Sequence, residues 1–309
     1  MVCDDYIDYL RLIRRYSERT CTLYRQSIED YLQFCSYVDS DSLEEYLSVQ
    51  LLRSYQVELL DSRKMSSASV KLAMSALSGW CRYLMKQGVI TSNPVRSLKK
   101  PSEPKRLPEF FRQDALQEYF ESTKGVMEWG SHDRKMSRII ISLLYSTGIR
   151  RSELIALKRS SVDFSRKVLL VLGKGDKMRE IPLTDSICDE ILLYLQSQDS
   201  LKYASVELDS PLIQTEKGAK LYPMLVERIV RRELGGLSTA GGRKSPHVLR
   251  HSIATELLSQ GADINSIKEM LGHSSLAATQ VYTHTSIERL QKVYESAHPR
   301  AKNEGKNGD

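Results

Sequence analysis

A chain of 309 residues has room for about two domains, and an apolar fraction of 41% is sufficient for ordinary globular cores. The net charge is +6: residues 1–104 carry 14 Lys and Arg against 13 Asp and Glu, and the remainder carries 31 against 26. This mild excess in the second part is compatible with a polyanionic partner and is weak evidence for one. No run of about 18 apolar residues occurs, which argues against a membrane span.

The cysteines and the acidic N-terminus bear on the compartment. The five cysteines are scattered and lack a Cys-x-x-Cys pair, which argues against a disulfide framework and against a Cys-based zinc site. Asp4 and Asp5 make the first residues acidic, whereas a secretory signal begins with basic residues. We therefore expect reduced thiols in a cytoplasmic protein that has no membrane partner.

Residues 4–88 have apolar side chains at spacings of three and four, which predicts a bundle of four short helices. Ser17 and Ser67 precede two of the apolar runs as expected N-caps, and Gly88 is expected to end the last helix. Residues 93–108 combine prolines with cations, and we expect a linker there that forms no helix and need not pack. This basic linker either lies along phosphates or is a solvated tether, and the sequence favours neither.

A second domain is expected at residues 109–300, followed by a polar tail at 301–309. Its pattern is mainly helical, but residues 168–172 and 178–182 are short apolar or alternating runs around a Gly-Lys-Gly-Asp turn, which predicts a β-hairpin. Helices are expected at residues 113–122, 135–146, 152–157, 187–198, 224–233, 246–259, 264–271, 275–283 and 286–297. With a helical first domain at residues 1–92, the fold class is mainly α with a small β-hairpin.

Arg150 is the first candidate for an anion-binding residue. It follows Gly148, a predicted helix stop, and precedes the helix at 152–157, so it lies beside a helix N-terminus, which favours anions. Glu153 is three residues further along on the same helical face, where we expect it to orient Arg150. The alternatives are an ordinary exposed cation and a first-turn acid favoured by the helix dipole.

Ser245 and Pro246 predict another helix start, because a serine cap is followed by proline at the first helical position. His247 and Arg250 then share the opening turn and face one anion, and histidine exchanges protons near neutral pH. His247 and His251 also have the spacing of zinc ligands on a helix. No Glu follows His247 and Arg250 adds a cation to that face, so we expect no metal there, and we expect His251 to pack or hydrogen-bond inside the domain.

Three further residues stand in short phrases. Lys174 lies at the hairpin tip between two glycines, where the backbone can approach a ligand and the ammonium group can donate a proton. The alternatives are a turn lysine that aids solubility and, within the same turn, Lys177 as the functional lysine. His273 follows the expected end of a helix, either as a donor to phosphate or as a capping or core histidine. Tyr282 is one of 16 tyrosines, so composition alone does not select it.

Four phrases carry a family resemblance: Thr147-Gly148-Ile149-Arg150-Arg151-Ser152-Glu153-Leu154, His247-Val248-Leu249-Arg250, Leu271-Gly272-His273-Ser274-Ser275 and Gln280-Val281-Tyr282-Thr283-His284. They resemble those of tyrosine site-specific recombinases of the phage-integrase superfamily, and the chain is most similar to the Xer subgroup. The resemblance covers most of residues 4–300 and is densest after Thr147. Arg151, Ile253 and a long segment at 125–132 depart from the family pattern.

The resemblance implies an enzyme that cuts and rejoins DNA strands through a 3′-phosphotyrosyl intermediate. The ester keeps the bond energy of the phosphodiester, so no ATP, metal or other cofactor is implied. The implied catalytic residues, with Glu153 in support, are Arg150, Lys174, His247, Arg250, His273 and Tyr282.

The implied roles follow the needs of phosphodiester cleavage. Arg150 and Arg250 clamp the phosphate, because a planar guanidinium grips two non-bridging oxygens at once. Tyr282 is the nucleophile, and its phenol needs nearby cations and an acceptor because its ordinary pKa is about 10. Lys174 protonates the leaving 5′ oxygen, and His247 exchanges the proton of the phenol.

The implied architecture is a clamp around DNA, with a SAM-like domain at residues 1–92 that contacts the core site and a catalytic domain at residues 109–300. The implied partners are double-stranded DNA at specific recombination sites, further protomers in a homotetramer or in a heterotetramer with a second recombinase, and a DNA translocase as activator. Residues 286–297 either dock on a neighbouring protomer or pack in their own domain. The implied role is chromosome dimer resolution, and hence chromosome partition at cell division, or mobile-element integration and excision, in the cytoplasm at the nucleoid.

Two other functions are compatible with such a fold. A type IB topoisomerase-like enzyme shares the clamp and the tyrosine but relaxes supercoils without exchanging partners. A catalytically inactive DNA-binding regulator keeps the fold without the chemistry. The length and the Xer-like phrases favour recombination over the first, and the complete residue set argues against the second.

Overall fold

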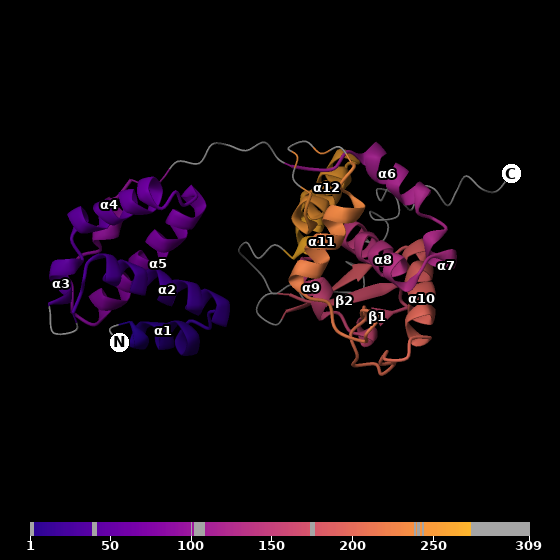
Figure 1. Ribbon diagram of the computed structural model, residues 1–309, viewed down its shortest axis with the longest axis horizontal. Coiled ribbons are helices and arrows are strands. Elements are labelled where there is room, and N and C mark those ends of the chain that lie inside the picture. Colours follow the sequence, from indigo (N-terminus) through magenta and orange to yellow (C-terminus); the bar gives the residue numbers. More distant parts are fainter. Residues whose placement is uncertain are drawn as a thin grey trace. The chain divides into compact units, whose positions relative to one another are not determined.

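The computed structural model describes residues 3–38, 42–99, 101, 109–173, 177–237, 239, 242 and 244–272. The chain divides into two compact units, residues 1–106 and residues 107–309 (Figure 1). None of the helices in the described ranges combines the length and the apolar character that crossing a lipid bilayer requires.

The described part of the first unit is built from helices. Its α-helices are α1 (Asp4–Asp8), α2 (Glu18–Phe34), α3 (Leu43–Tyr46), α4 (Val49–Val57) and α5 (Ser67–Lys86). Two π-helical turns, η1 (Tyr9–Ile13) and η2 (Glu58–Ser62), continue α1 and α4. The prediction of four short helices is wrong, because α3 is a fifth, single-turn helix and because α2 and α5 have 17 and 20 residues.

Aromatic side chains lie in the core of the first unit. Trp80 of α5, Tyr31 of α2 and Tyr55 of α4 are fully buried, and the rings of Tyr31 and Tyr55 meet edge-on with centroids 5.1 Å apart. A Cβ atom added at Gly79 would lie 2.3 Å from the hydroxyl oxygen of Tyr6, so α1 and α5 approach each other at a glycine.

Serine side chains begin the two long helices of this unit. Ser17 caps α2 as predicted, since its hydroxyl oxygen accepts a hydrogen bond from the backbone N–H three residues further along. The cap of α5 is Ser66 and not the predicted Ser67, because Ser66 has the extended backbone (φ −64°, ψ 148°) that a cap requires. Gly88 follows the end of α5 with φ +73°, as expected for a residue that ends a helix.

The expectation of an unpacked linker at residues 93–108 is wrong for its first part. Pro94–Ser97 form a 3-10 helix, η3, because proline at the first helical position lacks only an N–H that would have no helical partner there. Val95 is buried in the core of the first unit, and Gln56 Nε2 donates to the carbonyl oxygen of Lys99 at 2.9 Å. Most of the remainder of this segment lies outside the described residues.

The second unit surrounds one buried helix. Of the 16 residues of α8 (His132–Thr147), 13 are buried, which is typical of a core helix. It packs against α7 (Val126–Trp129), α9 (Arg151–Ala156), α10 (Asp185–Asp199), α11 (Pro223–Glu233) and α12 (Pro246–Ser259) (Figure 1). The other helices described here are α6 (Gln113–Ser122), η4 (Arg159–Ser161) and α13 (Ile264–Leu271).

Several predicted helices of the second unit have the predicted bounds. The predictions at 113–122, 246–259 and 264–271 match α6, α12 and α13 at both ends. The predicted helices at 275–283 and 286–297 lie outside the described residues. The fold class, mainly α with a small β element and two domains, is confirmed.

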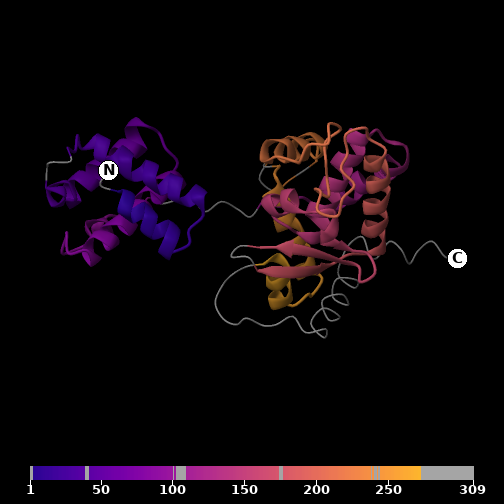
Figure 2. The ribbon, with the colours of Figure 1, turned by 90° about the horizontal axis from the view of Figure 1, so that it is seen from below.

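An antiparallel sheet completes the unit (Figure 2), in the order β1 (Val162–Asp163), β2 (Val168–Leu172) and β3 (Met178–Pro182). Strands β2 and β3 are the predicted hairpin, and β1 adds a short third strand. Leu169 and Val171 of β2 are buried opposite Ile181 and Arg179 of β3. An arginine therefore occupies an inward position among apolar side chains.

Candidate active site

The end of α8 meets two other helices at Gly148. This residue caps α8 in the left-handed region, with φ +59°. A Cβ atom there would lie 2.6 Å from Cδ2 of Leu271 and 3.2 Å from Cγ2 of Ile253. A side chain would strain the backbone and collide with α13, so this position requires glycine. Ile253, which departs from the family pattern, is fully buried in this contact.

Arg150 is the N-cap residue of α9. Its backbone N–H donates to Oε2 of Glu153 at 2.8 Å, and its Nη1 donates to Oε1 of the same carboxylate at 2.8 Å. Its Nη2 donates to the carbonyl oxygen of Gly272 at 2.9 Å. The side chain is 32% exposed, so the guanidinium is held in place and is still accessible to an anion. The contact that helical spacing predicted between Arg150 and Glu153 is present.

Arg179 of β3 holds the same carboxylate, and no sequence pattern singled it out beforehand. Its Nη1 and Nη2 donate to Oε1 and Oε2 of Glu153 at 3.1 and 2.7 Å, and its Nε donates to the carbonyl oxygen of Met270 at 3.0 Å. The side chains of Arg179 and Glu153 are each 5% exposed. The available signal was strand alternation, because Arg179 and Ile181 share the inward face, and a charge at such a position implies a buried partner.

Glu153 is ionised in this environment. Burial alone raises the pKa of a carboxyl group, but hydrogen bonds from Arg179 and from the backbone N–H of Arg150 outweigh burial and lower the pKa of Glu153 to about 2. The carboxylate therefore remains negative between two arginines throughout the physiological pH range.

Arg250 lies in the first turn of α12 and is 7% exposed. Its Nη1 donates to the carbonyl oxygen of Gly148 at 2.6 Å, and its Nη2 donates to the carbonyl oxygen of Leu271. Burial, and then the positive charge of Arg150, lower the pKa of Arg250 to about 10. The second cause means that the guanidinium groups of Arg150 and Arg250 interact, although they come from different helices.

Arginines converge on the C-terminus of α13. Three consecutive carbonyl oxygens accept hydrogen bonds there: Met270 from Arg179, Leu271 from Arg250 and Gly272 from Arg150. The last carbonyl groups of a helix have no partner within it, and the helix dipole makes this end negative, so cations are favoured. The end of α13 thus brings Arg150 and Arg250 into one place.

His247 is exposed and lies at the start of α12, three residues before Arg250. Desolvation by neighbouring atoms, and then the positive charges of Arg151 and Arg250, lower the pKa of His247 below its ordinary value. The imidazole is therefore neutral at neutral pH and is able to accept a proton. Arg151 itself donates to Oε2 of Glu227 on α11 at 3.0 Å.

His251 is exposed, and the prediction that it packs or hydrogen-bonds inside the domain is wrong. The buried face of α12 includes Leu249, Ile253 and Leu257, and His251 lies on the other side of the helix. Within the described residues, no group of three His, Cys, Asp or Glu side chains is arranged to hold a metal ion.

Lys174, His273 and Tyr282 lie outside the described residues. The residues that precede the first two are described. Gly173 follows β2, and Gly272 ends α13 with φ +66°. The structure therefore brings together the two predicted arginines and the points at which the chain continues to Lys174 and His273.

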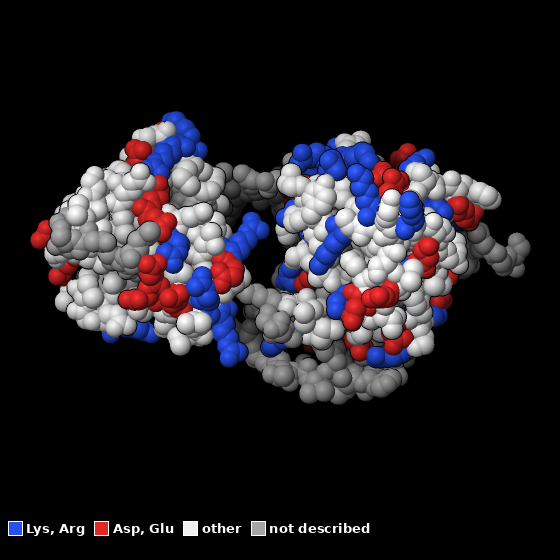
Figure 3. Space-filling view, turned by 60° about the horizontal axis from the view of Figure 1, so that its bottom comes forward, with Lys and Arg blue, Asp and Glu red and all other residues white. Residues whose placement is uncertain are grey.

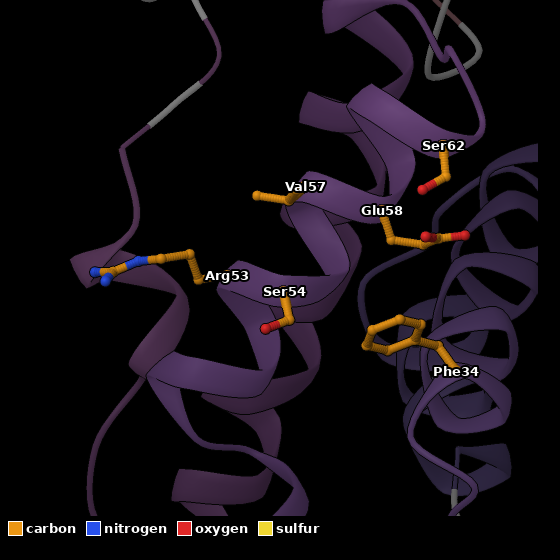
Figure 4. Close-up of a pocket in the computed structure, with 6 residues that line it drawn as sticks. All are labelled: Phe34, Arg53, Ser54, Val57, Glu58 and Ser62. Atoms are coloured by element: carbon orange, nitrogen blue, oxygen red, sulfur yellow. The ribbon is translucent and has the colours of Figure 1, made fainter.

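Two surface features lie outside this cluster. Lys and Arg side chains gather along the upper edge of the second unit in Figure 3, and α11 carries exposed Arg228, Arg231 and Arg232. An open hollow of about 390 Å³ in the first unit is lined by Phe34, Arg53, Ser54, Val57, Glu58 and Ser62 (Figure 4). In Figure 4 Phe34 comes from α2 and the other five residues from α4 and η2, Arg53 lies away from Glu58 and Phe34, and none of the six is a predicted catalytic residue.

Comparison with known proteins gives the family. Residues 109–289 match the phage integrase family, and residues 3–88 match the N-terminal SAM-like domain of phage integrases. Tyrosine recombinase XerC of Bacillus pumilus (strain SAFR-032) is 34% identical over 298 residues, which cover 96% of this chain and 95% of the relative. Tyrosine recombinase XerC of Chlorobaculum parvum (strain DSM 263 / NCIMB 8327) is 33% identical over 318 residues, covering 96% and 94%.

Solved structures share the fold at lower identity. The XerH site-specific recombinase, in a pre-cleavage complex with its difH substrate, superposes with a TM-score of 0.65 at 24% identity and covers 91% of this chain and 80% of its own. The Tn1549 transposon integrase in complex with transposon right end DNA superposes with a TM-score of 0.68 at 17% identity, covering 94% and 98%.

A helical SAM-like unit followed by a helix-rich unit with convergent arginines defines a tyrosine recombinase. The chain belongs to the phage integrase family, and its Xer relatives match it over nearly its whole length. The resemblance predicted from the four phrases is confirmed. These relatives and structures are recombinases and integrases, and they support neither the topoisomerase-like alternative nor the regulator.

Proposed function

We propose that this tyrosine recombinase cuts and rejoins double-stranded DNA at specific recombination sites, with Tyr282 as the nucleophile and with Arg150 and Arg250 as the clamp on the scissile phosphate. The observation that carries the proposal is that Arg150 and Arg250 bind the carbonyl oxygens of adjacent residues, Gly272 and Leu271. Two guanidinium groups at one point match the charge of a phosphate that is becoming five-coordinate.

The clamp supplies most of the electrostatic stabilisation in this proposal. Each charge-assisted hydrogen bond to a phosphate oxygen contributes roughly 1.5–3 kcal/mol. Glu153 sets the direction of Arg150, because it binds both the backbone N–H and the guanidinium of that residue. A ligand that displaces the α13 carbonyl groups from the arginines exchanges one set of oxygen acceptors for another, so the guanidinium groups need not lose hydrogen bonds.

The proton transfers are assigned to two other residues, and a third residue donates a hydrogen bond to the phosphate. His247, with its lowered pKa, accepts the proton of the Tyr282 phenol during attack. Lys174 protonates the departing 5′ oxygen, and His273 donates to a non-bridging phosphate oxygen. The phosphotyrosyl ester retains the energy of the original linkage, so a 5′ hydroxyl from another strand reverses the step without ATP, metal or cofactor.

The proposal assigns a role to each part of the chain. Residues 1–92 contact the DNA core site, residues 93–108 connect the domains, residues 109–300 carry the catalysis, and residues 301–309 are a polar tail. The matches of residues 3–88 and 109–289 to the two family domains support this division.

The active assembly is proposed to be a synapse of four protomers, as a homotetramer or with a second recombinase, in which a DNA translocase activates exchange. Its place is the cytoplasm, at the nucleoid. Its role is chromosome dimer resolution, or the integration and excision of a mobile element. Similarity to XerC proteins over 96% of the chain supports the chromosomal role.

The decisive experiment is covalent capture on DNA. Fragmented genomic DNA of the organism that encodes the chain is incubated with the protein, and protein-linked fragments are recovered under denaturing conditions and sequenced. The wild type is expected to enrich a defined site, and Tyr282→Phe is expected to bind that site without forming an adduct. Arg250→Ala is expected to lose cleavage and some affinity for phosphate.

A two-site assay separates recombination from supercoil relaxation. Two duplexes that carry the captured site and differ in length are expected to yield hybrid products with the wild type. Relaxation of a supercoiled plasmid without the site, and no hybrid product, would instead identify a topoisomerase. Cleavage by Tyr282→Phe would assign the nucleophile to another tyrosine.

A further inference from the structure

Arg179 is a buried cation that donates hydrogen bonds to Glu153 and Met270, at the boundary of the proposed active site. Its guanidinium binds both oxygens of Glu153 and the carbonyl oxygen of Met270. Through Glu153 it is one contact away from Arg150, whose Nη1 lies 2.8 Å from the same Oε1 atom. Arg179 therefore connects β3, α9 and α13.

Two glycines also pack against this guanidinium. A Cβ atom at Gly272 would lie 3.1 Å from Nη1 and 3.2 Å from Cζ of Arg179, and a Cβ atom at Gly173 would lie 3.3 Å from Nη1. Gly272 immediately precedes His273, and Gly173 immediately precedes Lys174. The backbone thus lies close to the guanidinium of Arg179 at the residue before Lys174 and again at the residue before His273.

Stability alone is a weak reason for an arginine at this position. Desolvating an ion pair costs several kcal/mol, and well-packed apolar residues often replace such a pair without loss of stability. The neighbours of Arg179 on the inward face, Val171 and Ile181, are apolar, so an aliphatic residue would suit the sheet. The fork-to-fork geometry with Glu153 instead fixes a direction, which is what a clamp residue needs.

We infer that Arg179 is a positioning residue for the strand-cleavage step. It holds Glu153 in the orientation that directs Arg150 at the phosphate, and it fixes the two backbone points from which the chain continues to Lys174 and His273. This inference rests on the proposed function, because the cleavage rate is the quantity that it predicts. Arg179 itself does not contact the substrate in this scheme.

The test compares buried arginines within the same unit. Arg179→Met removes the fork and keeps a long apolar side chain. The matched control is Arg138→Met, because Arg138 is also buried and pairs with Glu190 at 2.8 Å, but its hydrogen bonds go to α6, Thr123 and α10. Single-turnover cleavage is measured on a suicide duplex made from the captured site, with DNA affinity and thermal unfolding measured alongside.

Arg179→Met is expected to slow cleavage about 100-fold, the range seen when one preorganised donor is lost. DNA affinity is expected to change less than about threefold, since positioning acts in the transition state and not in ground-state binding. Arg138→Met is expected to cleave at nearly the wild-type rate once its thermal unfolding shows that it is folded. Equal slowing in both variants would assign Arg179 a merely structural role.

A DNA substrate with a neutral linkage at the cut position separates loss of positioning from loss of structure, because only loss of positioning should depend on the charge of the linkage. A methylphosphonate at the cut position removes the negative charge that Arg150 neutralises. If Arg179 acts through Arg150, the defect of Arg179→Met is expected to fall from about 100-fold to less than about tenfold on this substrate. An unchanged defect on both linkages would overturn the inference.

Two further variants keep the test decisive if Arg179→Met fails to fold. Arg179→Lys retains the charge and loses the fork, and it is expected to show the same difference between the two linkages. The double variant Arg179→Lys with Glu153→Gln is expected to slow cleavage by less than the product of the two single effects, because both substitutions interrupt one path to Arg150. Wild-type protein without an adduct would refute the proposed function, whereas normal cleavage by folded Arg179 variants would refute this inference alone.

Discussion

Nη1 of Arg250 donates a 2.6 Å hydrogen bond to the carbonyl oxygen of Gly148, so the first turn of α12 is joined to the residue that ends α8. Gly148 lies two residues before Arg150, and this bond therefore holds the segment that leads into the second arginine of the clamp. The position of one proposed catalytic arginine thus depends on the backbone next to the other.

Gly148→Ala is expected to destabilise the second unit by about 2–5 kcal/mol. The left-handed backbone costs an alanine roughly 1–2 kcal/mol, and overpacking against Leu271 and Ile253 adds roughly 1–3 kcal/mol. Urea unfolding of the variant measures the loss. The matched control is Gly261→Ala, which has φ +86° and nothing within 4 Å of its added Cβ, so only the backbone cost is expected. Equal losses in the two variants would mean that the contact contributes nothing.

Glu153 makes stability depend on acid. Folding lowers the pKa of Glu153 from its ordinary value of 4.5 to about 2, so the ionised form stabilises the fold above about pH 5, and this stabilisation is lost as the pH falls toward 2. The shift corresponds to about 3 kcal/mol. Denaturant unfolding is measured at about pH 2 and at about pH 7, on either side of this window. The wild type is expected to lose this stabilisation at the lower pH, and Glu153→Gln is expected to lack this loss.

The control for this pH dependence is Glu180→Gln. Glu180 is on the same strand as Arg179 but pairs with Arg166, and it makes no described contact with Glu153. This variant is expected to keep the acid-dependent loss. Curves of identical shape for the wild type and Glu153→Gln would show that Glu153 does not titrate as its contacts predict.

Arg151→Leu is expected to raise the pKa of His247. Desolvation is the first cause of the lowered pKa and would remain, whereas the positive charge of Arg151, the second cause, would be removed. NMR titration of the His247 ring protons measures this change. If neutral His247 is the base, the rising limb of the cleavage rate against pH is expected to move to higher pH in the variant.

Arg166→Leu is the matched control for Arg151→Leu. Arg166 also pairs with a glutamate, but it lies in the turn between β1 and β2. The control variant is expected to leave the His247 titration unchanged. A shift in the NMR titration without a shift in the rate profile would separate His247 from the proton transfer.

Local sequence patterns predicted those helices and strands whose ends are set by neighbouring residues. Both strands of the hairpin and the bounds of α12 and α13 follow from alternation, from proline at a first helical position and from glycine after a last one. The burial of Val95 in η3 was missed, because composition suggested a solvated linker while the core of the first unit accepts this side chain.

The site was less accessible to this reasoning. Arg150, Glu153 and Arg250 were found from phrases and helix starts, but Arg179 has no such phrase around it. Its partners, Glu153 and Met270, are distant in the sequence, and only the folded chain brings them to β3. The prediction that His251 lies inside the domain was also wrong, because the buried side of α12 is set by the helices that pack against α12.

Gly272→Ala tests whether the packing of backbone against Arg179 matters for cleavage. Alanine at φ +66° costs roughly 1–2 kcal/mol, and its Cβ would lie 3.1 Å from Nη1 of Arg179, which Glu153 and Met270 prevent from retreating freely. Single-turnover cleavage is expected to fall about tenfold or more, whereas Gly261→Ala, with the same kind of backbone strain and open space around it, is expected to cleave normally.

The double variant Gly272→Ala with Arg179→Met distinguishes contact from strain. If the methyl group acts by displacing the guanidinium, it has little effect once the guanidinium has been removed. The double variant is then expected to slow cleavage by less than the product of the two single effects. Strictly multiplicative defects would mean that Gly272 and Arg179 affect cleavage independently. In that case the close approach of Gly272 to Arg179 would reflect only the left-handed end of α13.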